Sequence, residues 1–249
     1  MRQLTAKIKP ASGFSHVVHI LLTSLLPALL FIFVRTRFYQ LAVLLIVLSK
    51  WRMFAVKPRH WLANIQANGV DLIVGLAILV FMTHSSSQLL QLIWAAAYGV
   101  WLLLIKPQST TWGVASQAII GQSVGLVALF LAWGASPIVV LVIAAWAIAY
   151  LSSRHFFANF EEGLTRFLAC VWGYFAAALT WLLSHWLLFY GPIAQPALFL
   201  SVIGFGLGGM YYLEKTERMT PMVRRQLLFV MMAVVIIVIT FSDWGDKTI

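Results

Sequence analysis

Residues 64–83 read NIQANGVDLIVGLAILVFMT, in which a few amides and one carboxylate, Asp71, precede an unbroken apolar run. A helix of about 20 mainly apolar residues is long enough to cross the hydrocarbon core of a bilayer. The stretch therefore predicts a membrane-spanning helix. Because each helical residue adds about 1.5 Å, Asp71 is expected about 10 Å inside that helix, where a charged group needs a partner.

The rest of the chain has the same apolar character. Hydrophobic residues make up 62% of its 249 residues, charged residues make up 10%, and the mean hydropathy is +0.92. This composition excludes a soluble globule with a charged surface. We predict an all-α polytopic integral membrane bundle that forms a single transmembrane domain over residues 1–249. Its nine predicted spans are 17–34, 38–56, 64–83, 88–105, 112–133, 137–152, 164–189, 196–213 and 225–242.

Basic segments alternate with uncharged turns between these spans, and this alternation indicates a topology. Fourteen of the 17 lysines and arginines fall at the N-terminus or in alternate breaks, and the positive-inside rule places that side in the cytoplasm. We therefore predict a multi-pass protein of a cell (inner) membrane, with its N-terminus in the cytoplasm and its C-terminus outside. This topology exports Arg35 and Arg37, so residues 17–56 are predicted either as two full spans or as a re-entrant hairpin.

The formal net charge of +10 comes from short basic clusters in the breaks and not from one soluble basic domain. This distribution argues against a nucleic-acid partner and favours contact with the lipid bilayer, including anionic lipid at the basic cytoplasmic loops. No cofactor and no metal site is predicted, since Cys170 is the only cysteine and the six histidines lack the paired spacing of a ligand set. The sequence identifies no protein partner.

Two strings of eight residues, RHWLANIQ from Arg59 and RHFFANFE from Arg154, are identical at four positions. This match at an offset of 95, with a weaker one at an offset of 51, predicts repeated helical hairpins near 57–105, 106–153 and 154–213. An N-terminal hairpin at 14–56 and a C-terminal span at 225–242 flank them. Repeats in membrane carriers place polar segments around a binding site. A duplicated scaffold with interfacial anchors is the alternative interpretation.

The same offset aligns Asp71 with Arg166, and we predict that these two opposite charges pair within the bundle. Asn64, Asn68 and Asp71 share one helix face, because they are four and then three residues apart. The predicted ligand-binding face consists of Asn64, Asn68, Asp71, Gln122, Asn159 and Arg166.

Glycines inside the apolar runs are expected to allow close packing of helices. Gly204-x-Gly206-x-x-Gly209 has the letters of a dinucleotide-binding fingerprint, but it lacks the preceding strand that this motif requires. Small residues in a membrane span instead let two helix backbones approach each other, and the same holds for Gly121 and Gly125.

The sequence leaves three classes of function open. The first is a small-molecule or lipid transporter, or the membrane subunit of one. The second is a non-catalytic scaffold or assembly subunit, and the third is a membrane-embedded lipid-modifying enzyme. No catalytic residues are predicted, because Cys170 and His185 would lie about 22 Å apart on one helix, so the sequence leans away from catalysis. A water-accessible cavity at the polar face would favour transport, whereas a closed hydrogen-bonded cluster would favour a scaffold.

Overall fold

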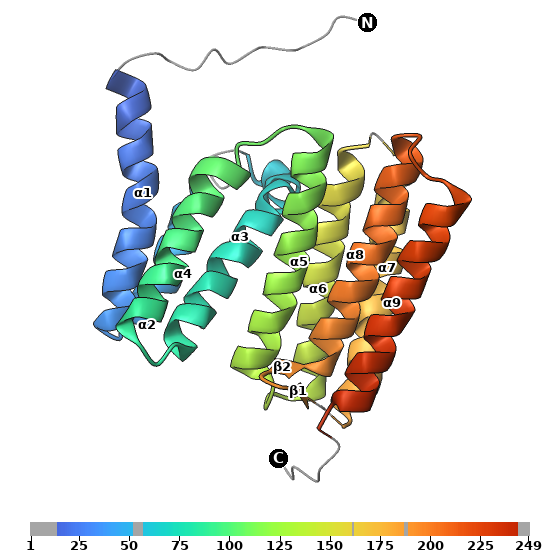
Figure 1. Cartoon of the computed structure of the whole chain (residues 1–249). Helices are drawn as coiled ribbons and strands as arrows, with labels where there is room; N and C mark the ends of the chain where they lie inside the picture. The colour runs from blue at the N-terminus through green and yellow to red at the C-terminus, as the bar shows by residue number, and fades with distance from the viewer. Residues whose placement is uncertain (1–13, 52–56, 161, 187–188, 244–249) are drawn as a thin grey trace, which may run out of the picture.

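The computed structural model describes residues 14–51, 57–160, 162–186 and 189–243. These residues form an all-α bundle, as predicted, together with one small β-hairpin that was not predicted (Figure 1). The α-helices are α1 Phe14–Arg35, α2 Tyr39–Leu48, α3 Trp61–His84, α4 Gln88–Val100, α5 Thr111–Trp133, α6 Ile138–Ala158, α7 Thr165–Ser184, α8 Gln195–Lys215 and α9 Pro221–Phe241. The short elements are the 3-10 turn η2 Pro58–His60, the π-helical turn η3 Trp101–Ile105, and strands β1 Phe189–Tyr190 and β2 Ile193–Ala194.

Seven helical segments are long and apolar enough to cross a membrane, one for each of α3 to α9, with η3 continuing α4. They confirm the predicted spans from 64–83 to 225–242. The predicted span 17–34 lies within the 22-residue helix α1, although neither this segment nor 38–56 is among the seven candidate spans. Of the predicted span 38–56, only Tyr39–Leu48 forms an α-helix among the described residues, and residues 52–56 lie outside them. A ten-residue helix such as α2 is about 15 Å long, about half the thickness of the hydrocarbon core.

Figure 1 shows that α3, α5, α7 and α9 begin at one end of the bundle, drawn at the top, where α4, α6 and α8 end. We call this the basic end, because the loops and helix ends there carry most of the described lysines and arginines. The opposite end holds the turns after α3 and α5 and the β-hairpin. Basic and largely uncharged breaks therefore alternate along the chain, as the sequence predicted, and the basic breaks share one end of the bundle. Which end faces the cytoplasm stays a prediction.

Helix α5 lies at the centre of the bundle, where it packs against α3, α6 and α8. A Cβ atom at Gly121 would stand 2.7 Å from Cγ1 of Val70 on α3, and one at Gly125 would meet Cγ2 of Ile73. A Cβ at Gly206 would likewise meet Met231 on α9. These glycines allow close helix packing, as predicted.

The structure does not show the predicted repeat. Arg59 and His60 lie in η2 and Trp61 begins α3, whereas Arg154, His155 and the residues after them form the last turns of α6. A hairpin equivalent to the one that begins at Trp61 therefore does not begin at Phe156, because the helix that follows, α7, starts at Thr165.

Candidate functional site

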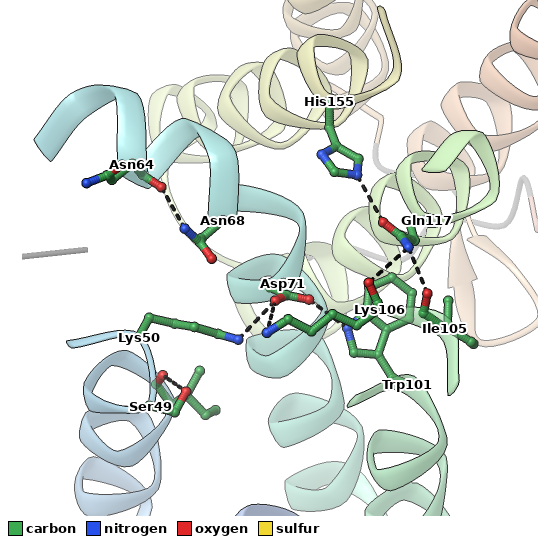
Figure 2. A network of polar contacts seen from close by, with 11 residues as sticks. Ser49, Lys50, Asn64, Asn68, Asp71, Trp101, Ile105, Lys106, Gln117 and His155 are labelled. Carbon is green, nitrogen blue, oxygen red and sulfur yellow. Dashed lines mark hydrogen bonds and ion pairs between the residues drawn. The ribbon is translucent and has the colours of Figure 1, made fainter. Parts of the chain in front are cut away.

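Asp71 lies on α3 toward the basic end, and it forms the centre of a buried ion cluster (Figure 2). Its Oδ2 atom is 2.9 Å from Nζ of Lys50 and 2.5 Å from Nζ of Lys106. The indole Nε1–H of Trp101 donates to Oδ1 at 3.0 Å. Both carboxylate oxygens therefore have partners, and the prediction that Asp71 needs a cation inside the bundle is supported.

The identity of that cation was predicted wrongly. Asp71 pairs with Lys50 and Lys106, whereas Arg166 lies exposed near the start of α7. The prediction rested on the 95-residue offset, and the two strings that define this offset occupy different places in the fold. Lys50 follows α2, and Lys106 follows η3, which continues α4; both α2 and α4 pack against α3.

The π-helical turn η3 explains how Trp101 and Lys106 reach the same carboxylate. Residues five apart point about 140° away from each other in a regular α-helix. Here the backbone N–H of Lys106 donates to the carbonyl oxygen of Trp101 at 2.8 Å, a bond that widens the turn by one residue. The wider turn brings both side chains to the face that contacts Asp71.

Gln117 on α5 closes the end of this turn. Its Nε2 donates to the carbonyl oxygens of Ile105, at 2.7 Å, and of Gln108, at 3.0 Å. Its Oε1 is 3.1 Å from Nε2 of His155 on α6. One buried amide thus satisfies carbonyls that the helix end leaves without partners and links three elements.

The structure thus adds Lys50, Trp101, Lys106, Gln117 and His155 to Asp71. Sequence reasoning missed these five because it searched for a partner at a repeat-equivalent position. The usable signal was simpler: a carboxylate near the basic end of a span lies within reach of the lysines that end neighbouring apolar segments.

Burial lowers the pKa of the Lys50 ammonium to about 8 from its ordinary 10.5, although the Asp71 carboxylate acts in the opposite direction. Between these values the unfolded chain binds more protons at this lysine than the folded protein does, so stability rises with pH. We expect the free energy of unfolding of the wild type, minus that of Lys50→Met, to increase from about pH 8 to about pH 10.5. Chemical unfolding in detergent at a series of pH values measures this difference in the free energy of unfolding. A difference that does not change with pH would contradict the prediction.

The other predicted site residues do not converge on Asp71. The side-chain amide of Asn68 donates to the carbonyl oxygen of Asn64 within α3, at 3.0 Å. The amide of Asn159 donates to the carbonyl oxygen of Thr111, at 3.2 Å, and so joins the loop after α6 to the start of α5. Gln122 belongs to a second region, on the far side of α5.

That second region is a cavity of about 450 Å³ between α5, α6, α7 and α8, which we call the α5–α8 cavity. Most of its lining is apolar. Its lining residues are Ala118, Ile119, Gln122, Ser123, Ser152, Ser153, Phe156, Phe157, Leu168, Val171, Trp172, Phe175, Ser201, Gly204, Phe205, Leu207, Gly208 and Tyr211. The hydroxyl oxygens of Ser152 and Ser201 are buried and have no hydrogen-bond partner among the described residues.

Gln122 fixes the wall of the α5–α8 cavity. Its Nε2 donates to the carbonyl oxygen of Leu200 on α8, at 3.0 Å, and its Oε1 accepts the indole N–H of Trp172 on α7, at 2.7 Å. Gly204 leaves room for this amide, since a Cβ atom there would meet Nε2 of Gln122. Of the predicted polar face, Gln122 alone lines the cavity.

The cavity opens sideways between α7 and α8. Val171 and Phe175 on α7 and Phe205 on α8 all line it, yet they are 50%, 41% and 58% exposed. These side chains belong to segments with the length and hydropathy of membrane spans. In a bilayer the opening therefore faces lipid.

The basic end of the cavity holds a small charged group. The Tyr211 hydroxyl donates to Oε1 of Glu162, and the same oxygen forms an ion pair with Lys215. These two contacts hold the pKa of the Glu162 carboxyl below its usual value. The Lys215 ammonium lies 5.6 Å from the centroid of the Tyr211 ring.

Within the described residues, no group of three or more His, Cys, Asp or Glu side chains could hold a metal ion. No protein-family model, curated protein or solved structure matches the chain. The ion cluster around Asp71 and the laterally open α5–α8 cavity are the candidate functional features that the described residues form.

Proposed function

We propose that this polytopic membrane protein is a carrier for a lipid-like molecule, which it holds in the α5–α8 cavity. The observation that carries the proposal is the cavity itself, about 450 Å³ in volume and open toward the bilayer. Pockets for small molecules are typically about 300–1,000 Å³, mainly apolar, with a few polar groups that fix orientation. The α5–α8 cavity has these three properties.

The lining favours an amphiphile over a water-soluble solute. A molecule that enters between Val171 and Phe205 passes only apolar side chains, as a hydrocarbon chain can do without losing hydrogen bonds. The polar groups of the lining are few. The amide of Gln122 is already bonded to Leu200 and Trp172, and the hydroxyl oxygens of Ser152 and Ser201 are buried within the wall. The lining therefore offers a ligand mainly apolar contacts.

The Asp71 cluster supports the second candidate function, a scaffold. All its charged groups have partners, and Lys50 and Asp71 are less than a tenth exposed. A hydrogen-bonded cluster of this kind links α2, α3 and η3, and its charges are satisfied without a ligand. We assign it a structural role that supports the carrier region.

A membrane enzyme is the least favoured class. A serine nucleophile needs an adjacent base, and the Ser152 hydroxyl has no hydrogen-bond partner among the described residues. The Ser153 hydroxyl donates to the carbonyl oxygen of Ala149, and His155 on the same helix contacts Gln117.

Two neighbouring glycines on α8 test the carrier proposal. A Cβ atom at Gly208, which lines the cavity, would lie 3.7 Å from Ile119 and Phe156, an ordinary contact. We therefore expect the leucine side chain of Gly208→Leu to extend into the cavity. A Cβ at Gly209 meets nothing within 4 Å, which makes Gly209→Leu the matched control. We expect Gly208→Leu to reduce labelling by a photoactivatable diacyl lipid about tenfold, equivalent to about 1.4 kcal/mol, and Gly209→Leu to leave it unchanged.

Mass spectrometry of the crosslinked peptides measures this labelling, and the labelled residues should map to α5–α8. Lipid movement is then followed in proteoliposomes with a fluorescent lipid whose outer-leaflet copies are quenched chemically. Equal labelling of the two leucine variants would refute the cavity as a binding site. Labelling that depends on Gly208 without lipid movement in the wild type would favour the scaffold.

A further inference from the structure

One face of α8 continues from the α5–α8 cavity to a lysine. Ser201, Gly204, Gly208, Tyr211 and Lys215 follow each other at intervals of three or four residues, the spacing of a single helix face. The first four line the cavity. Lys215 stands one turn beyond Tyr211, at the basic end of the helix, so the apolar cavity leads toward a positive charge.

The contacts of Lys215 leave its ammonium within reach of a ligand. The ion pair with Glu162 is partly open to water, since the Lys215 side chain is 44% exposed and that of Glu162 is 21% exposed. A surface ion pair of this type typically contributes only about 0–1 kcal/mol, so a competing anion can replace the carboxylate. The Tyr211 hydroxyl, which donates to Glu162, would donate to that anion in the same way.

Positive charge exceeds negative charge around this end of the cavity. Among the described residues, Glu162 pairs with Lys215 and Glu214 pairs with Arg224. The remaining described carboxylate between α8 and α9, Glu217, is outnumbered by Arg218 and Arg225. Arg166 lies two residues before Leu168, which lines the cavity, and no described carboxylate forms an ion pair with this arginine. An anion at Lys215 therefore enters a region with a surplus of cations.

We propose that the molecule bound in the α5–α8 cavity is an anionic amphiphile. Its acidic headgroup, a phosphate or carboxylate, replaces Glu162 at Lys215 and accepts a hydrogen bond from the Tyr211 hydroxyl. Its apolar part occupies the cavity. This assignment rests on the carrier function proposed above and adds the charge class of the ligand. Glu162 occupies the headgroup position when no ligand is bound.

Lysines at membrane interfaces also bind anionic lipid without any cavity, each contributing about 1 kcal/mol. Arg225 provides the comparison, because it is an exposed cation near the start of α9, at the same end of the bundle, and does not line the cavity. A headgroup site at Lys215 and general attraction to the surface therefore predict different results for Lys215→Gln and Arg225→Gln.

The test uses three photoactivatable probes with identical diacyl tails: phosphatidic acid, phosphatidylcholine and diacylglycerol. The full chain is reconstituted in neutral nanodiscs. For the wild type we expect labelling by phosphatidic acid to exceed labelling by diacylglycerol about tenfold. Lys215→Gln should remove this preference and leave diacylglycerol labelling unchanged, which also shows that the variant is folded. Glu162→Gln should increase phosphatidic acid labelling, because it removes the competing charge, and Arg225→Gln should have no effect.

Equal labelling by phosphatidic acid and diacylglycerol, or equal effects of Lys215→Gln and Arg225→Gln, would overturn the headgroup assignment. Inorganic phosphate in millimolar excess should not displace phosphatidic acid, and full displacement would mean a site for the free anion alone. Failure of the proposed function is distinguishable: labelling by all three probes would be insensitive to Gly208→Leu if the cavity binds no lipid, and lipid movement would be absent in the wild type if the protein binds lipid without carrying it.

Discussion

Replacement of Asp71 by asparagine is expected to lower the free energy of unfolding by about 3–5 kcal/mol, the range for removal of one partner from a buried ion pair. Asp71 is the carboxylate shared by Lys50 and Lys106, and its Oδ1 also accepts the Trp101 indole. Without it, two ammonium groups stand close together, and the Lys50 side chain is only 7% exposed to water. Chemical denaturation of both proteins in detergent measures this loss in the free energy of unfolding.

A double variant separates charge from packing. Asp71→Leu together with Lys50→Met removes the buried charges, and the remaining Lys106, 37% exposed, can turn toward water. We expect this double variant to be more stable than Asp71→Leu alone. Glu217→Gln, at an exposed carboxylate outside the cluster, is the control and should change stability little. If Asp71→Asn costs no more than this control, the cluster does not stabilise the bundle.

Replacement of Gly125 by alanine is expected to destabilise the bundle by about 1–3 kcal/mol, the usual cost of overpacking a core. The new Cβ would meet Cγ2 of Ile73 on α3 and would stand 3.2 Å from Cγ2 of Ile148 on α6. Helix α5 is held on both sides, so it cannot shift away from one neighbour without crowding the other.

The matched control is Gly209→Ala on α8, where the added Cβ meets nothing within 4 Å. Alanine there should keep or raise stability, because glycine is less favourable than alanine by about 1 kcal/mol in a helix interior. Adding Ile73→Ala to Gly125→Ala removes the clashing methyl, so the double variant should lose less stability than the sum of the two single losses. If thermal unfolding shows that the stability losses of the two single variants simply add, the contact between α3 and α5 is not the cause of the destabilisation by Gly125→Ala.

The sequence by itself determined the membrane class and the positions of the spans from α3 to α9. Hydropathy over about 20 residues is a local property, and the bilayer imposes it on each span independently of the others. The same reasoning did not determine the second predicted span, because an apolar composition does not reveal that α2 contains only ten residues.

The sequence also determined that Asp71 requires a buried partner, since the cost of an isolated charge in a membrane does not depend on the fold. It could not determine which cation that partner is. Lys50 and Lys106 lie on opposite sides of Asp71 along the chain, and the π-helical turn η3 that aims Lys106 has no distinct sequence pattern. The offset that favoured Arg166 measured similarity of letters, not proximity in space.

Only the tertiary structure decided that the α5–α8 cavity exists. Ser201, Gly204 and Gly208 are small residues on one face of α8, and from the sequence they indicate close packing as readily as empty space. Gln122 binds α7 and α8 but leaves the space beside them unfilled. A cavity is the volume that four helices together fail to occupy, so no local pattern in any one of them can encode it.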